Sequence, residues 1–207
     1  MRTLGAFVFP GFETLDYFGP IEMLGGMGSE IEVITVAAQK TPVPSVHGQR
    51  IVVDTTCAEK DDFELVLIPG GDAALGACTD QALLSWIAAA SAHAERVMAV
   101  CTGTILLGAS GVLDGRRATT NKLDFTDTVP LAPKVDWAKQ ARWVRDGKFY
   151  TSSGVSAGMD MALAVLADLF GMEEAEKMAV SCEYAWHQDA NWDPFAVSAG
   201  LVAPPGK

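Results

Sequence analysis

The sequence predicts an α/β protein with a mostly parallel sheet and helices on both of its faces. Short, continuous apolar runs recur along the 207 residues, and most are followed by a segment whose apolar residues have helical spacing. The clearest runs end at small residues or at proline. Such alternation is typical of a parallel sheet, because parallel strands must be joined by crossovers that are usually helical.

The first quarter of the chain contains two of the predicted strands. Leu4–Phe9 is an unbroken apolar run that stops at Pro10-Gly11, as expected of a strand buried on both faces. Residues 13–24 have apolar side chains at helical spacing, and residues 30–37 alternate as a second strand does. Two prolines and a His-Gly pair within residues 41–54 predict a short hairpin.

The middle of the chain repeats the strand–helix pattern twice. Residues 65–68 form an apolar strand that ends at a proline and two glycines, and residues 80–92 form a helix. Residues 96–100 are the next strand, which ends at Cys101 and leads into a helix over 102–109. Two chemically distinctive turns therefore follow two buried strands.

The next segment adds a mixed group of strands and a long helix. Residues 118–120 predict a short strand with a helix after it, and residues 135–152 predict two or three strands. The helix over 156–170 has one apolar face, and Ser156 is expected to cap its start. Gly171 stands where a residue of positive φ ends many helices.

The C-terminal part contains one more helix and a tail. Residues 173–186 predict a helix with acidic side chains in its first turn, where the helix dipole favours them. Residues 189–207 are rich in proline, alanine and glycine and predict an irregular tail. Since neither a shift in composition nor a repeat divides the remainder, we expect one domain over residues 1–188.

Composition excludes several classes of partner. With 49% hydrophobic and 20% charged residues the chain can bury a sizeable core. Its 26 acidic and 15 basic residues give a net charge of −11, which disfavours binding to nucleic acid and to anionic membranes. Four cysteines without regular spacing favour a reducing compartment, and the expected location is the cytoplasm.

Cys101 is the clearest candidate for chemistry. An apolar strand runs into this cysteine, and a small-residue turn and a helix follow, which is the layout of a nucleophile elbow. The free N–H groups and the dipole of the helix are expected to favour the thiolate, the reactive form. Cys57, Cys78 and Cys182 fit the ordinary role of small buried apolar residues.

Two further features are candidates for the same site. Gly70 and Gly71 follow a buried strand, and their backbone N–H groups are candidates for an oxyanion hole. Asp16 lies between large apolar neighbours that would raise the pKa of its carboxyl group and suit it to proton transfer. A solvated helix residue is an equally good reading of Asp16, and Glu13 and Glu22 compete for its role.

Other common site chemistries lack support in the sequence. The three histidines have no recognisable place beside Cys101, so a Cys-His dyad is not expected. Metal-ligand spacing and glycine-rich phosphate loops are also lacking. We therefore expect no metal and no organic cofactor.

These motifs together resemble the DJ-1/PfpI superfamily over residues 3–187. The matching segments are Phe9-Pro10-Gly11-Phe12, Leu15-Asp16 with Gly19-Pro20, Ile68-Pro69-Gly70-Gly71, Val100-Cys101-Thr102-Gly103, Ala118-Thr119-Thr120 and Thr151–Asp160. The resemblance implies a flavodoxin-like, class I glutamine amidotransferase-like three-layer sandwich and a homodimer.

Within the superfamily the combination looks most like the isocyanide hydratase branch, which has Asp at the position of Asp16 and Cys-Thr-Gly at the elbow. Many glyoxalase-like members have a histidine where this chain has Asn121, and an asparagine cannot accept a proton at neutral pH. The resemblance implies that Cys101 attacks an organic isocyanide and that Asp16 moves the proton. Water then releases an N-formamide from the resulting thioimidate.

The remaining site residues are assigned by the same resemblance. Backbone N–H groups of Gly70, Gly71 and Thr102 would hold developing charge or orient water, and Gly154 and Val155 would line the pocket opposite the sulfur. Two alternatives stay open. One is a glyoxalase- or deglycase-like enzyme acting on small dicarbonyls, and the other is a redox-sensing or stress protein that uses the same cysteine without catalysis.

Overall fold

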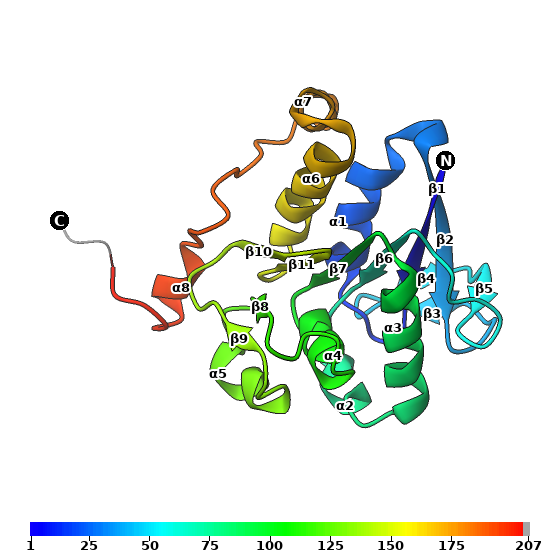
Figure 1. Cartoon of the computed structure of the whole chain (residues 1–207), viewed down its shortest axis with the longest axis horizontal. Coiled ribbons are helices and arrows are strands. Elements are labelled where there is room, and N and C mark those ends of the chain that lie inside the picture. Colours follow the sequence, from blue (N-terminus) through cyan, green and yellow to red (C-terminus); the bar gives the residue numbers. More distant parts are fainter. Residues whose placement is uncertain (205–207) are drawn as a thin grey trace.

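A seven-stranded sheet forms the centre of the computed structural model, which describes residues 1–204 (Figure 1). Its strands follow the order β10-β11-β7-β6-β1-β2-β5, and every neighbouring pair is parallel except β10 and β11. The strands are β1 (Arg2–Phe7), β2 (Ile31–Ala37), β5 (Thr55–Thr56), β6 (Leu65–Ile68), β7 (Arg96–Val100), β10 (Trp143–Asp146) and β11 (Phe149–Ser152). The predicted parallel sheet is confirmed.

Helices cover both faces of this sheet, which confirms the three-layer sandwich (Figure 1). One layer consists of α1 (Thr14–Gly25), α6 (Ala157–Phe170) and α7 (Met172–Ser181). The other consists of α2 (Ala73–Ala77), α3 (Gln81–His93) and α4 (Gly103–Ala109). Shorter helical turns are α5 (Phe125–Thr128), α8 (Phe195–Ser198) and the 3-10 turns Gly28–Glu30 and Val129–Leu131. Within residues 1–204, none of the helices has the length and apolar character needed to span a membrane.

Two small strand pairs lie outside the central sheet. The predicted hairpin is present as β3 (Val43–Pro44) and β4 (Arg50–Ile51), which are antiparallel. The strand expected over 118–120 is shorter, and as β8 (Arg117–Ala118) it pairs with β9 (Asp136–Trp137) rather than with the main sheet.

The last large helix, α7, is shorter than the sequence predicted, and Asp160 of α6 binds the chain that follows it. The helix expected over 173–186 stops at Ser181. The Asp160 carboxylate accepts hydrogen bonds from the Tyr184 hydroxyl and the His187 N–H, both at 2.9 Å. These bonds hold the chain after α7 in an extended path that a helix cannot follow.

Two other expectations about chain ends are corrected. Ser156 precedes α6 but makes no side-chain cap bond, because its hydroxyl accepts a hydrogen bond from Arg142 instead. The tail expected to be irregular contains α8, and Asp193 and Ala196 within it are buried. Residues 205–207 of that tail lie outside the described residues. Gly171 has the expected positive φ, +97°.

The close packing of β6 against the start of α4 positions the turn at Cys101. A Cβ atom on Gly103 would lie 2.4 Å from the Ile68 carbonyl oxygen and 2.7 Å from that of Pro69. Only glycine therefore allows α4 to begin directly beside the end of β6. This contact brings the turn after β7 next to the turn after β6.

We predict that Gly103→Ala lowers the free energy of unfolding by roughly 1–3 kcal/mol, because the new methyl group meets backbone atoms that cannot move aside. Gly76→Ala is the control, since Gly76 lies in α2 and no atom stands within 4 Å of its Cβ position. Urea denaturation measures both variants. Equal midpoints for the two would contradict the packing described here.

Candidate active site

Cys101 sits on a strained turn between β7 and α4. Its φ is +57°, a left-handed conformation that costs a residue other than glycine roughly 1–3 kcal/mol. Hydrogen bonds hold the turn in place: the Cys101 N–H points at the carbonyls of Ser152 and Ser153, each at 3.3 Å, and the Thr120 hydroxyl donates to the Cys101 carbonyl at 2.8 Å. The strained backbone thus places the sulfur beyond the carboxyl ends of the strands at a cost in stability.

Asp16 lies next to this sulfur, in the first turn of α1. The residue is fully buried, and its Oδ2 accepts a hydrogen bond from the Gly70 N–H at 2.9 Å. Among residues 1–204 its other oxygen, Oδ1, has no hydrogen-bond partner. A buried carboxylate oxygen without a partner, beside a thiol, is suited to receive the thiol proton.

Gly70 permits this arrangement because it has no side chain. A Cβ atom there would lie 2.6 Å from the Thr102 Oγ1 and 2.8 Å from the Asp16 Oδ2. The Gly71 N–H donates to Thr102 Oγ1 at 2.9 Å, and the Thr102 hydroxyl donates to the Gly71 carbonyl at 3.1 Å. Both glycine N–H groups are therefore engaged within the protein. The expectation that they form a free oxyanion hole is corrected: Gly70 positions Asp16, and Gly71 binds Thr102.

Hydrogen-bond donors other than the Gly70 and Gly71 N–H groups lie near the sulfur. The backbone N–H groups of Thr102 and Val155 and the side chain of Asn121 each stabilise the Cys101 thiolate and oppose the rise of its pKa. Val155, like Cys101, has a positive φ, +48°, which is unusual for a β-branched residue. Gly154 lies beside Asn121, whose Cγ would be 3.8 Å from a Cβ on this glycine.

Asn121 is the residue whose role sequence reasoning missed. Its Oδ1 accepts hydrogen bonds from the N–H groups of Leu123, at 2.7 Å, and Asp124, at 3.2 Å. Its Nδ2 donates to the Asp124 carboxylate at 2.9 Å, so the amide is held in one orientation. The sequence marked this position only by the absence of histidine. Its place directly after the 118–120 segment was the available signal.

A pocket of about 110 Å³ opens onto the sulfur. It is lined by Glu13, Val46, Gly71, Asp72, Cys101, Thr102, Asn121, Asp124 and Val155. Three of these residues carry carboxyl groups, and the site therefore disfavours anions by charge.

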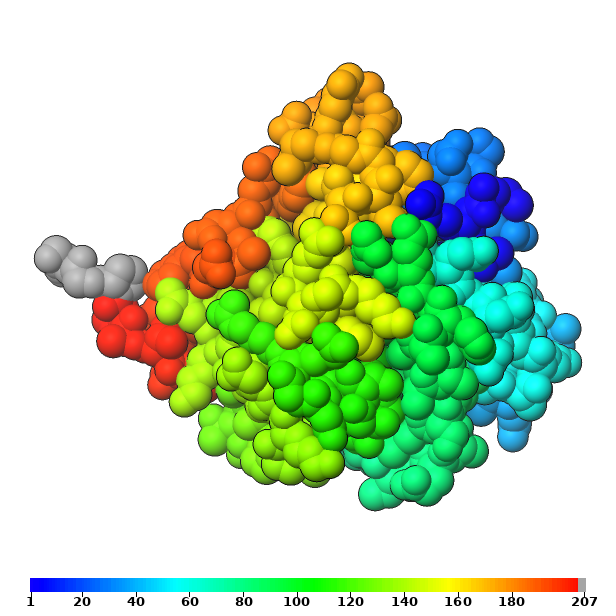
Figure 2. Space-filling model, viewed as in Figure 1, coloured from blue at the N-terminus to red at the C-terminus, as the bar shows by residue number. Residues whose placement is uncertain are grey.

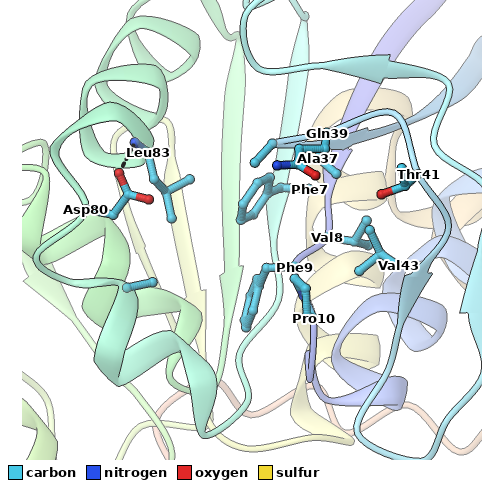
Figure 3. Close-up of a pocket in the computed structure, with 12 residues that line it drawn as sticks. Phe7, Val8, Phe9, Pro10, Ala37, Gln39, Thr41, Val43, Asp80 and Leu83 are labelled. Atoms are coloured by element: carbon cyan, nitrogen blue, oxygen red, sulfur yellow. Dashed lines mark hydrogen bonds between the residues drawn. The ribbon is translucent and has the colours of Figure 1, made fainter.

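A larger pocket, of about 330 Å³, lies elsewhere, between the hairpin β3–β4 and α3 (Figure 3). Figure 3 shows apolar side chains on its walls, among them Phe7, Phe9 and Leu83. The nearby Asp80 carboxylate accepts hydrogen bonds from backbone N–H groups at the start of α3. Cys101 and Asp16 are not among its lining residues, and the candidate site is therefore the smaller pocket at the sulfur.

Burial controls the protonation of both reactive groups. It raises the pKa of the Cys101 thiol to about 12, and the charge of Asp16 adds to the effect. It also raises the pKa of the Asp16 carboxyl to about 7, against the Gly70 hydrogen bond. Burial thus opposes ionisation of both groups, whereas the donors of the turn favour it, and the resting thiolate expected from the sequence stays a prediction. Because the two groups interact closely, their protons belong to the pair and not to either residue alone.

A metal site requires acidic, cysteine or histidine side chains that lie close together. Across residues 1–204, no group of three or more His, Cys, Asp or Glu side chains is arranged to hold a metal ion. The arrangement around Cys101 can instead support nucleophilic attack by sulfur with proton transfer through Asp16.

We predict that Asp16→Asn stabilises the fold at about pH 8, because the buried carboxylate then no longer has to be charged. Since the folded-state pKa lies above the unfolded one, the stability that Asp16 contributes is complete at low pH and is lost as pH rises through about 7. The shift corresponds to a difference on the order of 4 kcal/mol at most.

Urea midpoints at several pH values measure this effect. The gain from Asp16→Asn should shrink toward about pH 5, and Glu22→Gln, an exposed change on the same helix, should show no such pH dependence. A gain that is the same at every pH would show that Asp16 does not titrate in this range.

Comparison with known proteins agrees with the fold. The model of the DJ-1/PfpI family matches residues 4–168. An isonitrile hydratase of Pseudomonas putida is 33% identical over 184 residues, which cover 88% of this chain and 78% of that protein. A deglycase of Thermococcus kodakarensis is 27% identical over 144 residues, covering 69% of this chain and 84% of that protein. The crystal structure of a ThiJ/PfpI family protein from Pseudomonas syringae has a TM-score of 0.81 at 30% identity, covering 97% of this chain and 84% of the other. With a match over most of its length and this fold, the chain belongs to the DJ-1/PfpI family.

Proposed function

We propose that this protein is an isonitrile (isocyanide) hydratase, which adds water to R–N≡C and releases the N-formamide R–NH–CHO. The observation that carries the proposal is the buried Asp16 carboxyl group, with one unpartnered oxygen, beside the Cys101 thiol. A carboxyl group is the proton carrier here, and no histidine lines the described pocket. The similarity to the Pseudomonas putida isonitrile hydratase supports the same activity.

The first half of the reaction joins sulfur to the substrate. Asp16 takes the proton of the Cys101 thiol as the sulfur attacks the terminal carbon of the isonitrile. Asp16 then gives this proton to the same carbon, which yields the thioimidate Cys101–S–CH=N–R. The substrate carbon thus gains one sulfur and one hydrogen, and the carboxylate is restored.

The second half releases the product. Asp16 accepts a proton from water as the water oxygen adds to the thioimidate carbon, and Asp16 then passes this proton to the nitrogen. Asp16 next takes the O–H proton of the tetrahedral intermediate, the C–S bond breaks, and Asp16 returns the proton to the departing sulfur, which restores the thiol. The N–H groups of Thr102 and Val155 and the Asn121 amide stabilise charge on sulfur in both halves.

The pocket favours a small substrate without negative charge. Its volume is about 110 Å³, and Glu13, Asp72 and Asp124 line it. An isonitrile group is uncharged and linear, so these carboxylates do not repel it as it approaches the sulfur. A small-molecule substrate and a homodimer, both implied by the family resemblance, stay predictions.

A dicarbonyl-converting activity is the second candidate, because the deglycase of Thermococcus kodakarensis matches over 69% of this chain. Asn121 disfavours it, since the amide bound to Asp124 cannot act as a base. The redox-sensing alternative needs an accessible thiolate, whereas Cys101 is 5% exposed and burial raises the pKa of its thiol.

We predict that the protein converts an aryl isonitrile into its N-formamide, and liquid chromatography measures this product. Cys101→Ala should abolish it, and Asp16→Asn should lower kcat by about 100-fold or more, because proton transfer loses its carrier. Cys182→Ala, at a half-buried cysteine beyond α7, is the matched control and should keep full activity. Lactate from methylglyoxal without formamide would favour the dicarbonyl activity. Neither product, with rapid peroxide oxidation of Cys101, would favour the redox sensor.

We also predict that the protein discriminates against anionic isonitriles. Isocyanoacetate should have a kcat/KM about tenfold or more below that of its methyl ester, because its carboxylate meets acidic side chains at the pocket. Asp72→Asn should reduce this difference, while Glu176→Gln, an exposed change on α7, should leave it intact. Equal use of the acid and the ester would rule out electrostatic selection.

A further inference from the structure

We propose that the C-terminal segment 190–198 is a positioning element of the active site, acting through a buried cluster of four charged side chains. The cluster consists of Lys122, Arg142, Asp160 and Asp193. The inference rests on the proposed function where it concerns turnover, but not where it concerns the reactivity of Cys101.

Arg142 is the centre of this cluster. Its Nε and Nη2 contact the Asp160 Oδ2 at 2.9 and 2.8 Å, and its Nη1 lies 3.9 Å from the Asp193 Oδ2. All four side chains are buried, and two positive charges stand against two negative ones. Since an unpaired buried charge is costly, removal of one member destabilises the arrangement of the others.

Asp193 enters the cluster from a segment that follows the rest of the fold. Figures 1 and 2 show the chain after α7, coloured orange to red, along one flank of the molecule. Backbone bonds attach it there: the Arg142 N–H donates to the Ala190 carbonyl at 2.8 Å, and the Asp193 N–H donates to the Gln140 carbonyl at 2.7 Å. The segment lies beyond residues 4–168, where the family model matches.

The first link from the cluster to the site runs through residues 153–156. The Ser153 N–H donates to the Arg142 carbonyl at 2.8 Å, and the Arg142 guanidinium donates to the Ser156 hydroxyl at 3.2 Å. These two bonds bracket Val155, a residue with a strained backbone that lines the same pocket as Cys101. Arg142 thereby holds the part of the pocket wall that stands beside the sulfur.

The second link runs through residues 119–122. The Lys122 ammonium donates to the Thr119 hydroxyl at 2.6 Å and to the Thr120 carbonyl at 3.1 Å. Between these residues and Lys122 stands Asn121, whose amide faces the sulfur. Burial lowers the pKa of Lys122 to about 8, and the Asp193 carboxylate opposes that change. The Asp193 carboxylate favours the charged form of Lys122 and lies 3.9 Å from Arg142 Nη1, so it is linked to the residues that hold both loops beside Cys101.

Asp193 is thus a positioning residue, because it touches neither the sulfur nor the pocket. Its loss should loosen Val155 and Asn121 without changing the acidic lining of the pocket. The Val155 N–H lowers the pKa of both Cys101 and Asp16, so a misplaced Val155 should raise the pKa of the pair. Glu13, which raises the pKa of Asp16 from the other side, is unaffected.

The test uses Asp193→Asn in the full chain, since asparagine keeps the shape and removes the charge. Iodoacetamide alkylation of Cys101, followed by mass spectrometry of its peptide over a pH series, should show a profile shifted upward by about half a pH unit. Isonitrile kcat should fall about tenfold with KM nearly unchanged, because misplaced groups slow the chemical step. Glu176→Gln, an exposed change on α7 away from the segment, should match the wild type in both assays.

Ser156→Ala provides a second variant that leaves all four charges in place and releases only the Arg142 bond to that hydroxyl. It should shift the alkylation profile in the same direction even if Asp193→Asn fails to fold. An unchanged alkylation profile in a folded Asp193→Asn, or in Ser156→Ala, would overturn the inference. A shifted profile in a protein without hydratase activity would instead overturn the proposed function and leave this inference intact.

Discussion

A carboxyl group and a thiol confined together away from water are the constraint on which the site depends. Water would solvate either anion separately, whereas burial makes two charges at this place prohibitively costly. Asp16 and Cys101 therefore hold one charge between them, and the proton moves with little change in net charge. Gly70 is the residue that allows such confinement, because any side chain there would strike Asp16 and Thr102.

The architecture and the elbow could be predicted from the sequence because both depend on local pattern. Apolar runs of four to six residues predicted β1, β6 and β7 within about two residues, and the small residues after Val100 predicted the sharp turn at Cys101. The protonation of Cys101 could not be predicted in this way. Its pKa depends on burial and on the charge of Asp16 in α1, which is remote in sequence.

The hydrogen-bond partners of the glycine turn also could not be predicted from the sequence pattern. Gly70 and Gly71 were expected to offer free N–H groups, yet Asp16 and Thr102 take them, because these partners arrive from other elements. The tail shows the same limit. Its composition predicted an irregular segment, but Asp193 is buried because Arg142 and Lys122 provide compensating charges from distant positions.

The costly features of this fold are concentrated at one edge of the sheet. Two strained backbones and a buried carboxyl group lie at the sulfur, and a buried cluster of four charges stands behind the loops that carry Asn121 and Val155. The fully buried apolar strands beneath them supply the stability that offsets these terms. Since each feature constrains a donor, an acceptor or a proton near Cys101, and none improves packing, the edge is organised for chemistry at the expense of stability. The larger apolar pocket beside β3–β4 differs in this respect, because none of its lining residues is one of the strained or buried reactive groups around Cys101.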